Sequence, residues 1–449
     1  MNRAIVSTFF LIAFLATCSS LPAAAPRVDV HEGTLEVPAY EFSGRELEPP
    51  LFESSTVEGT YPYPNFLRPY KPGGPVPQSC RAIFVENEYL RLTVIPALGG
   101  RIFSLYDKVN GREVFYKNDV LKFSSVNPRS AWLVGNLEIT GPYDHHTLTL
   151  KGEPFWFDKV LRHPDGSVSV VLSQIDPFYR MKVNFSVRLY PGLAAMQVTI
   201  FCYNRNDSRQ PYMFWVNAGV PAAEGTRFIY PMTRTIGHTT AEVADWPLYG
   251  GIDFSWYKNN RHMLGVFGID IYDNFLGAYD HDADYGTFRW ADRREVTGMK
   301  TWTWGKSRRA EQIERGYTDK AGPYIEIQSG RYVWDGHYEW LPPHTTEGWS
   351  EWWFPVAGIG GLVTTTRDLA LNLEVSPDPA GARSAVKLGI SANREIAGAK
   401  ILVATAADTL LRAAADLAPG RPLVRKIEGI SSDSAGLTGM RVVVADSSG

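Results

Sequence analysis

Short apolar stretches alternate with polar residues along most of the chain after Cys80, and turn signals such as Asn110-Gly111 and Pro191-Gly192 separate them. Alternation with a period of two predicts half-buried β-strands. The predicted strands are residues 82–84, 90–95, 101–107, 168–173, 182–190, 195–203, 324–328, 349–354 and 369–375. Residues 303–315 contain the best candidate for a brief helix. Regular strands with little helical periodicity predict a mainly β fold, either a sandwich or a barrel.

Composition divides the chain into further regions. Residues 26–78 are rich in proline, which blocks central strands and helices, so we expect an extended arm that lies over the main domain. Residues 79–375 form the main β domain. After Ser376 aromatic residues disappear, which predicts a small β-rich C-terminal domain over residues 376–449. Its expected strands are residues 385–392, 399–405 and 440–445, and residues 410–417 are expected to form a short helix.

The N-terminus has the pattern of an export signal. Arg3 precedes an apolar run over residues 8–17, and small residues follow up to Ala25. Two alternatives are open: cleavage near Ala25, or lipidation of Cys18, because residues 15–18 resemble a bacterial lipoprotein signal. We therefore expect an exported protein, periplasmic or extracellular, with or without a lipid anchor. No later stretch approaches the ~20 apolar residues of a transmembrane helix, so no transmembrane segment is predicted.

Charge and cysteine content narrow the classes of ligand. The net charge of −3 combines 45 basic and 48 acidic residues without long runs, which is not the electrostatic footprint of a nucleic-acid-binding protein. Neutral ligands fit this balance best. Cys80 and Cys202 remain after removal of the leader, and either a single disulfide or two buried free thiols fits them. Their spacing supports no metal site, and the oligomeric state is left open.

The segment from Gly135 to Leu150 concentrates groups that could carry chemistry. Glu138, Asp144, His145 and His146 follow one another within strand-like alternation. A carboxylate can act as a base or nucleophile, and histidine exchanges protons near neutral pH. Adjacent strand residues point to opposite faces, so one of the two histidines is expected to line a site. His146 is favoured because it has the same parity as Glu138 and Asp144.

Several motifs together resemble a known family. They are LRLTVIPALGGRI at residues 90–102, Asp107-Lys108, the segment of residues 135–146, Tyr279-Asp280-His281, TWTWG at residues 301–305 and YIEIQ at residues 324–328. The chain is similar, over about residues 30–375, to a bacterial family of domains of unknown function. The resemblance implies a galactose-mutarotase-like β-supersandwich, a sugar ligand, and a catalytic carboxylate on a late strand.

The resemblance places Glu326, on the YIEIQ strand, at the position of the mutarotase base. Alternation supports this independently, since Tyr324, Glu326 and Gln328 share one strand face while Ile325 and Ile327 share the other. Mutarotases also carry a histidine on a central strand. The comparable stretch from Gln210 to Asn217 contains none, which argues against simple mutarotation.

Hydrolysis of a glycosidic bond needs two carboxyl groups, one acid and one base or nucleophile. Glu326 as base or nucleophile and Glu138 as the acid are the predicted pair. Glu351 and Asp282 are the alternatives, because a carboxylate buried among tryptophans such as those flanking Glu351 has a raised pKa. The separation of the two groups does not follow from the sequence.

Other residues are candidates for binding a sugar. Trp302 and Trp304 share a strand face, and Gly305 lets a sugar approach Trp304 closely. Arg101, His145, Asp144, His281, Asp282 and Glu351 complete the predicted substrate-binding set, with His146 beside Glu326 and Glu138 in the catalytic set. Residues 280–286 carry three alternating aspartates as a calcium loop does, but their spacing excludes an EF-hand. Calcium is left open and no cofactor is predicted.

The leading functional hypothesis is hydrolysis of a glycosidic bond in an oligosaccharide. The alternative is a non-catalytic carbohydrate-binding protein of a glycan-uptake system, and sugar epimerase or lyase chemistry is a third. The first two differ in one respect: an enzyme needs two carboxyl groups facing one another, whereas a binding protein needs only aromatic and hydrogen-bonding groups.

Overall fold

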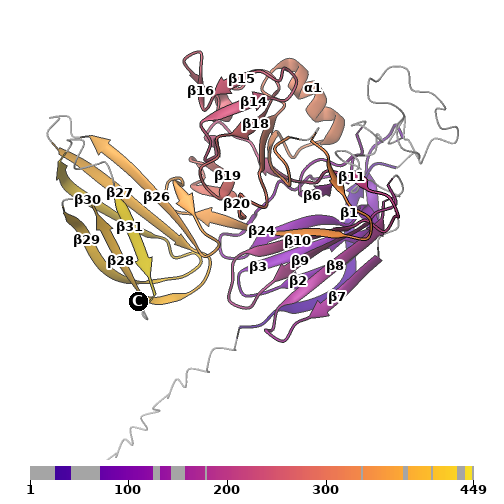
Figure 1. Ribbon diagram of the computed structural model, residues 1–449, viewed down its shortest axis with the longest axis horizontal. Helices are drawn as coiled ribbons and strands as arrows, with labels where there is room; N and C mark the ends of the chain where they lie inside the picture. The colour runs from indigo at the N-terminus through magenta and orange to yellow at the C-terminus, as the bar shows by residue number, and fades with distance from the viewer. Residues whose placement is uncertain are drawn as a thin grey trace, which may run out of the picture.

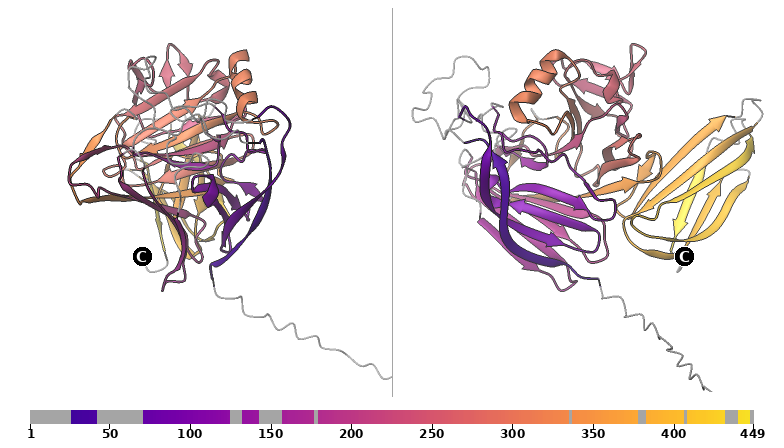
Figure 2. Two further views of the ribbon diagram at one scale, coloured as in Figure 1. Left: turned by 90° about the vertical axis from the view of Figure 1, so that its right-hand side faces the viewer. Right: turned by 180° about the vertical axis from the view of Figure 1, so that it is seen from behind.

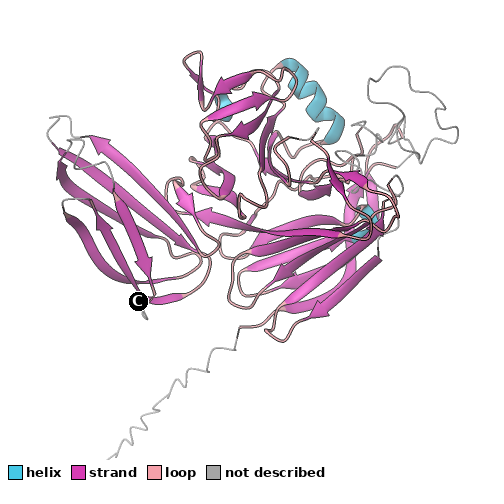
Figure 3. Cartoon of the chain, viewed as in Figure 1, coloured by secondary structure: helices cyan, strands magenta, loops and turns pink. Residues whose placement is uncertain are grey.

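The computed structural model describes residues 26–41, 71–124, 132–142, 157–176, 179–334, 337–377, 383–405, 408–431 and 440–446. Most of these residues form antiparallel strands, gathered in two large sheets and a smaller C-terminal body (Figure 1 and Figure 3). The predicted mainly β fold class is confirmed.

The first large sheet has twelve strands and carries most of the candidate site. In sheet order its strands are β1 (Asp29–Ala39), β2 (Val76–Glu86), β3 (Leu90–Ile95), β4 (Arg101–Asp107), β6 (Leu137–Thr140), β12 (Trp215–Pro221), β22 (Tyr324–Gly330), β21 (Gly298–Thr303), β18 (Leu264–Ile269), β14 (Arg234–Gly237) and β15 (Val243–Asp245), with β5 (Arg112–Glu113) paired to β4. Segments far apart in the chain, such as β6, β12 and β22, therefore become neighbours.

The second large sheet has eight strands. In sheet order they are β13 (Thr226–Ile229), β19 (Phe275–Asp280), β20 (Tyr285–Trp290), β24 (Thr346–Ala357), β10 (Met196–Tyr203), β9 (Lys182–Leu189), β8 (Val168–Ile175) and β7 (Phe157–Arg162). Two short ribbons accompany the sheets, β11 (Gln210–Tyr212) with β23 (Glu339–Leu341) and β16 (Leu248–Tyr249) with β17 (Ile252–Asp253).

The two large sheets pack face to face. One hydrophobic cluster joins them: Val94 and Ile327 come from the twelve-stranded sheet, and Val170 and Val198 from the eight-stranded sheet. Burying one apolar face of each sheet is the arrangement that period-two alternation allows. The supersandwich predicted from the motifs is therefore the architecture of the main domain.

The opposite face of the twelve-stranded sheet is also covered. Cys80, Phe103 and Leu133 belong to a second cluster on β2, β4 and the chain before β6. A third cluster packs Trp132 and Tyr324 together, with Ile313 of the helix α1 (Arg308–Tyr317) against it. Part of this face is thus shielded from solvent by loops and by α1, although the sandwich core lies on the other side.

The N-terminal arm differs from its prediction in one part. Residues 29–39 form β1, which pairs antiparallel with β2 over its whole length and lies at the edge of the sheet, as Figure 2 shows. Edge strands tolerate proline, and Pro38 stands opposite Pro77. Residues 1–25 and 42–70, which include the predicted leader and Cys18, lie outside the described residues.

The predicted brief helix is found, shifted toward the C-terminus. β21 runs to Thr303, and α1 begins only after Ser307, whose Oγ accepts a hydrogen bond from the backbone N–H of Ala310 at 3.3 Å. No helix in the described ranges is long and apolar enough to cross a membrane. Cys80 and Cys202 are both buried and form no disulfide with one another, which decides between the alternatives left open by the sequence.

The C-terminal domain is β-rich, as predicted, and has its own core. One sheet has, in order, β25 (Thr364–Thr365), β26 (Leu369–Pro377), β27 (Arg383–Ala392) and β30 (Leu423–Ser431), and the other has β29 (Thr409–Leu417), β28 (Ile396–Ala404) and β31 (Arg441–Ala445). Val386, Leu388 and Ile401 lie in the cluster between them. The expected helix over residues 410–417 is wrong: alanine favours helices, but pairing with β28 makes this segment a strand.

The boundary of the C-terminal domain that we propose lies before β25 rather than at Ser376. β26, which contains residues 369–375, pairs with β27 and so belongs to the C-terminal sheets. Ser376 lies near the end of that strand, in a hairpin and not in a linker. The two bodies also meet through the backbone, because the N–H of Ala194 donates to the carbonyl of Asn393 at 2.7 Å.

Candidate active site

Glu326 projects from the face of the twelve-stranded sheet that points away from the eight-stranded sheet. Its neighbours Ile325 and Ile327 are buried in the sandwich core, which confirms the predicted alternation of β22. Glu326 and Gln328 therefore share the opposite face. Glu326 is 5 % exposed, so it points neither into the sandwich core nor into bulk solvent.

Strand register brings a second carboxylate to the same face. On β6, Glu138 stands opposite Asn217 of β12, and Asn217 stands opposite Gln328 of β22. Neighbouring strands are about 4.8 Å apart, so side chains in this row are within reach of one another. Glu138 is 2 % exposed. The structure thus brings together the two carboxylates that the sequence predicted as a pair.

Three donors from the described residues bind the Glu326 carboxylate. The Tyr324 hydroxyl donates to Oε1 at 2.6 Å, Nε2 of Gln328 donates to Oε2 at 2.7 Å, and Nδ2 of Asn217 donates to Oε2 at 3.0 Å. The indole N–H of Trp304 donates in turn to the Tyr324 hydroxyl at 3.1 Å. Several hydrogen bonds donated to a carboxylate favour its ionised form.

Glu138 is held by a different set of groups. The Arg101 guanidinium donates from Nη2 to Oε2 at 3.1 Å, and both side chains are fully buried or nearly so. The indole N–H of Trp132 lies 3.1 Å from both carboxylate oxygens. Burial lowers the pKa of Arg101, and the charge of Glu138 opposes that shift. A buried ion pair of this kind favours an ionised Glu138.

The backbone before Glu138 is shaped to receive Arg101. Gly135 has φ of 77°, and its carbonyl accepts a hydrogen bond from Nη1 of Arg101 at 2.8 Å. A Cβ at this position would lie 2.4 Å from the ring of Tyr116. Glycine is therefore required twice here, for the left-handed conformation and for the close approach to Tyr116.

Asn217 links the two carboxylates. Its Nδ2 donates to Glu138 at 3.2 Å and to Glu326 at 3.0 Å, so the two carboxylates meet across a single amide nitrogen. Three buried polar atoms around them have no hydrogen-bond partner among the described residues: Oδ1 of Asn217, Oε1 of Gln328 and Nε of Arg101. Two of the three are acceptors, and unsatisfied buried acceptors are costly. A ligand rich in hydroxyl groups could donate to both.

An aromatic row continues the same face beyond Glu326. Trp302 stands opposite Glu326 in the register, and the rings of Trp302 and Trp304 meet edge to face at 5.2 Å. Both are half-buried. Nζ of Lys300 lies 5.5 Å from the Trp302 ring, and the ring of His238 lies 5.2 Å from it. Charged and aromatic groups thus lie side by side here.

The structure places other predicted residues elsewhere. Asp144, His145 and His146 lie outside the described residues. Glu351 is fully buried between the two sheets, 3.5 Å from Nε of Arg289, and not on the face of Glu326. Burial raises its pKa, as expected of a carboxylate among tryptophans, although Arg289 opposes the shift. Strand alternation alone does not tell the two faces of a sandwich apart, which is why Glu351 entered the predicted set.

His281 and Asp282 also lie apart from this face. They occupy the turn between β19 and β20 of the eight-stranded sheet, where the ring of His281 is 5.0 Å from the Trp256 ring. Asp280 accepts hydrogen bonds from the backbone N–H of Asp282 and of Ala283, so it stabilises its own turn. Among the residues that the structure describes, no group of three metal-binding side chains occurs.

Several residues of the cluster were not among the predicted site residues. Asn217 and Gln328 had a signal in the sequence, because each has the parity of a site-facing strand position. Trp132 had none, because it precedes β6 in a stretch without regular alternation and reaches Glu138 only through the fold. Arg101, which was among the predicted substrate-binding residues, is in contact with Glu138.

Solved structures similar to this chain fall into two groups. A TPR-domain containing protein from Parabacteroides distasonis is 24 % identical, with a TM-score of 0.66 over 76 % of this chain, and the chain spans 57 % of that protein's length. A galactose mutarotase-like protein from Clostridium acetobutylicum is 11 % identical, with a TM-score of 0.47, over 62 % of this chain and 96 % of that protein. A putative aldose 1-epimerase from Klebsiella pneumoniae is 12 % identical, with a TM-score of 0.43, over 62 % of this chain and 80 % of that protein.

Family models match both parts of the chain. Residues 364–449 are similar to the second domain of YphG-like proteins. Residues 55–356, more than half of the chain, match the family described as a domain of unknown function, DUF5107. The chain therefore belongs to the DUF5107 family, as its motifs had indicated.

Proposed function

We propose that this chain is a carbohydrate-active enzyme in which Glu326 is the base that accepts a proton from a sugar hydroxyl. The observation that carries the proposal is the environment of Glu326. Its carboxylate accepts three hydrogen bonds from described residues, which favour the ionised form, and it lies beside oxygens of Asn217 and Gln328 that have no partner among those residues. An ionised carboxylate next to free acceptors is suited to a ligand with several O–H groups.

A sugar fits the chemistry of this face better than other neutral ligands do. Its hydroxyl groups can donate to the free amide oxygens, while its C–H faces can stack on Trp302 or Trp304. The likeness to a galactose mutarotase-like protein makes aldoses the first compounds to test.

In the proposed reaction Glu326 takes the proton of the anomeric hydroxyl, and the oxygen that remains forms the carbonyl as the ring C–O bond breaks. The ring oxygen then needs a proton from an acid. Glu138 is poorly suited to that role because its pairing with Arg101 favours the ionised form. Asp144, His145 and His146 are the candidate acids that the sequence supplies.

Hydrolysis of a glycosidic bond is the second candidate. It is favoured by one observation, that the carboxylates of Glu138 and Glu326 both bind Nδ2 of Asn217 and so form a close pair. Hydrolysis requires one protonated carboxyl group at roughly 5–9.5 Å from the other. The Arg101 ion pair argues against Glu138 as that acid, so hydrolysis would need an acid from another residue.

The test compares wild type with Glu326→Gln, which keeps the shape of the side chain and removes its charge. Interconversion of aldose anomers is followed by NMR, and an oligosaccharide panel is screened for cleavage products. We expect Glu326→Gln to lose about a thousandfold in turnover while the melting temperature stays close to that of wild type. Glu428→Gln, an exposed carboxylate on the C-terminal β30, is the matched control and should keep full activity.

Two outcomes contradict the proposal. Turnover by Glu326→Gln at the wild-type rate would remove Glu326 from the chemistry. Saturable sugar binding by wild type without any conversion would favour the non-catalytic carbohydrate-binding protein. Release of shorter oligosaccharides, lost in Glu326→Gln, would select hydrolysis over anomer interconversion.

A further inference from the structure

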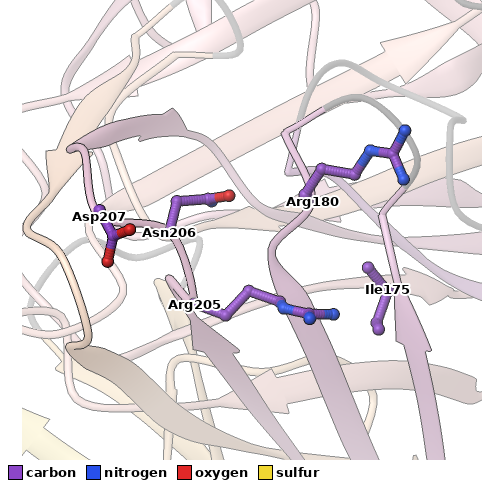
Figure 4. A pocket seen from close by; sticks show the side chains of 5 residues that line it. All are labelled: Ile175, Arg180, Arg205, Asn206 and Asp207. Atoms are coloured by element: carbon purple, nitrogen blue, oxygen red, sulfur yellow. The ribbon is translucent and has the colours of Figure 1, made fainter.

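A pocket of about 640 Å³ lies at one end of the eight-stranded sheet, on different elements from the Glu326 cluster. Five of the residues that the structure describes line it: Ile175, Arg180, Arg205, Asn206 and Asp207. Ile175 ends β8, Arg180 precedes β9, and the other three follow β10. Figure 4 shows the guanidinium groups of Arg180 and Arg205 on the side of the pocket where Ile175 lies, with Asp207 at the far side.

Arg180 occupies an unusual backbone conformation. Its φ is 58°, in the left-handed region that glycine and asparagine adopt most easily. Its N–H donates to the carbonyl of Asp176 at 3.0 Å, which closes the turn between β8 and β9. This backbone conformation disfavours arginine. The presence of arginine here therefore motivates the hypothesis that its side chain has a function.

Asparagine hydrogen bonds connect the loop that carries Arg205 to the turn that carries Arg180. Nδ2 of Asn206 donates to the carbonyl of Tyr179 at 2.9 Å, which ties the loop after β10 to the turn that carries Arg180. Nδ2 of Asn204 donates to the carbonyls of Ser208 and Leu341, both at 2.9 Å, and fixes the base of the same loop. The backbones that carry the two arginines are therefore fixed relative to one another.

The local charge is positive. Neither Arg180 nor Arg205 forms an ion pair with any carboxylate in the described ranges. Asp207, the acidic residue of the lining, pairs with Nε2 of His344 at 2.9 Å. Lys182 stands directly opposite Ile175 in the β8–β9 register and so adds a third cation on the same sheet face. Cations that lack anionic partners attract one from solution.

We propose that Arg180 and Arg205 form a binding site for a carboxylate, sulfate or phosphate group. A guanidinium offers a planar fork of N–H donors that matches the oxygens of such a group, and two of them on linked loops can both donate to it. The source we favour is an acidic substituent of a glycan, and the alternative is a free small anion. The site is separate from Glu326, and anion binding does not depend on the proposed activity; only the choice of a glycan as the favoured source rests on the proposed function.

The test is titration calorimetry of the full chain in a chloride buffer of low ionic strength, with sodium sulfate, sodium glucuronate and glucose as probes. We expect saturable binding of sulfate and glucuronate and none of glucose. Arg180→Asn, which suits the left-handed backbone, and Arg205→Gln should each weaken the affinity about tenfold, and the double variant should abolish it. Raising NaCl to about 0.3 M should weaken binding as well, because both arginines are exposed.

Arg162→Gln is the matched control, since Arg162 is an exposed arginine at the other end of the same sheet. It should bind both anions as wild type does. Tighter binding of a uronate-containing oligosaccharide than of free glucuronate would assign a glycan as the source, and equal binding would assign a free anion. Equal affinities for wild type and the double variant, or no saturable binding by wild type, would overturn the proposal.

Discussion

The main domain buries two carboxylate–arginine pairs, Arg101 with Glu138 and Arg289 with Glu351, on opposite faces of the twelve-stranded sheet. In the first pair the atoms lie 3.1 Å apart and Trp132 adds a hydrogen bond to each carboxylate oxygen. In the second the atoms lie 3.5 Å apart, and neither oxygen of Glu351 has a hydrogen-bond partner in the described part of the chain. Similar residue types thus meet in two different environments.

The surroundings of Glu351 and Glu138 show how a candidate site differs from a structural ion pair in a β-sandwich. Glu351 lies between the sheets, where Arg289 bonds Ser329 of β22 at 3.0 Å and so joins the two layers. Glu138 lies on the outer face, beside a second carboxylate and two acceptors that have no partner among the residues described. Burial and a tryptophan environment are common to both. The second carboxylate, bound to the same amide nitrogen, is what distinguishes the site from the structural pair.

The largest expected effect comes from breaking the structural pair. Arg289→Met leaves Glu351 buried without a cation, and removing one partner of such a pair costs about 3–5 kcal/mol of the free energy of unfolding. Urea unfolding followed by fluorescence measures it. Arg289→Met combined with Glu351→Leu should recover most of the loss, because a neutral pair of similar volume packs without an unpaired charge. A double variant as unstable as the single one would show that the two residues do not act as a pair.

A smaller effect is expected from Asn217→Asp at the candidate site. This change replaces the amide that donates to both Glu138 and Glu326 with a third carboxylate. Losing hydrogen bonds to charged groups costs about 2 kcal/mol, which corresponds to a roughly thirtyfold drop in turnover per folded molecule. Steady-state kinetics on the substrate found for wild type measures this. Asn184→Asp, at a half-buried position of β9, is the control, and an equal loss there would contradict a specific role for Asn217.

The smallest effect is a change in the pH dependence of stability in Glu351→Gln. Burial raises the pKa of Glu351 above its ordinary value of 4.5, so the folded chain keeps this proton to a higher pH than the unfolded chain does. Wild-type stability from this group therefore falls as pH rises above about 4.5. Glu351→Gln cannot ionise and should lack that decline. Thermal unfolding between pH 4 and pH 8 compares the slopes, and identical slopes would contradict a raised pKa.

Much of the fold followed from local pattern. The strands around residues 90–95, 101–107 and 324–328 were predicted because their alternation is clear and tight turns bound them. The segment of residues 410–417 failed because alanine favours a helix locally, while the gain from pairing with β28 is a property of the whole domain. The boundary at Ser376 was placed where aromatics vanish, but β26 already pairs with the C-terminal strands.

The candidate site was likewise determined in part by the local sequence and in part by the tertiary structure. Alternation by itself determined that Glu326 and Gln328 share a face opposite Ile325 and Ile327, because successive strand side chains point to opposite sides whatever the partner strands are. The tertiary structure decided which face becomes a site. Only the strand order β4, β6, β12, β22 brings Arg101, Glu138 and Asn217 to Glu326, from positions far apart in the chain. Glu351 has an equally suggestive local sequence, but packing of the two sheets encloses it, since burial depends on what covers a face and not on the strand that carries it.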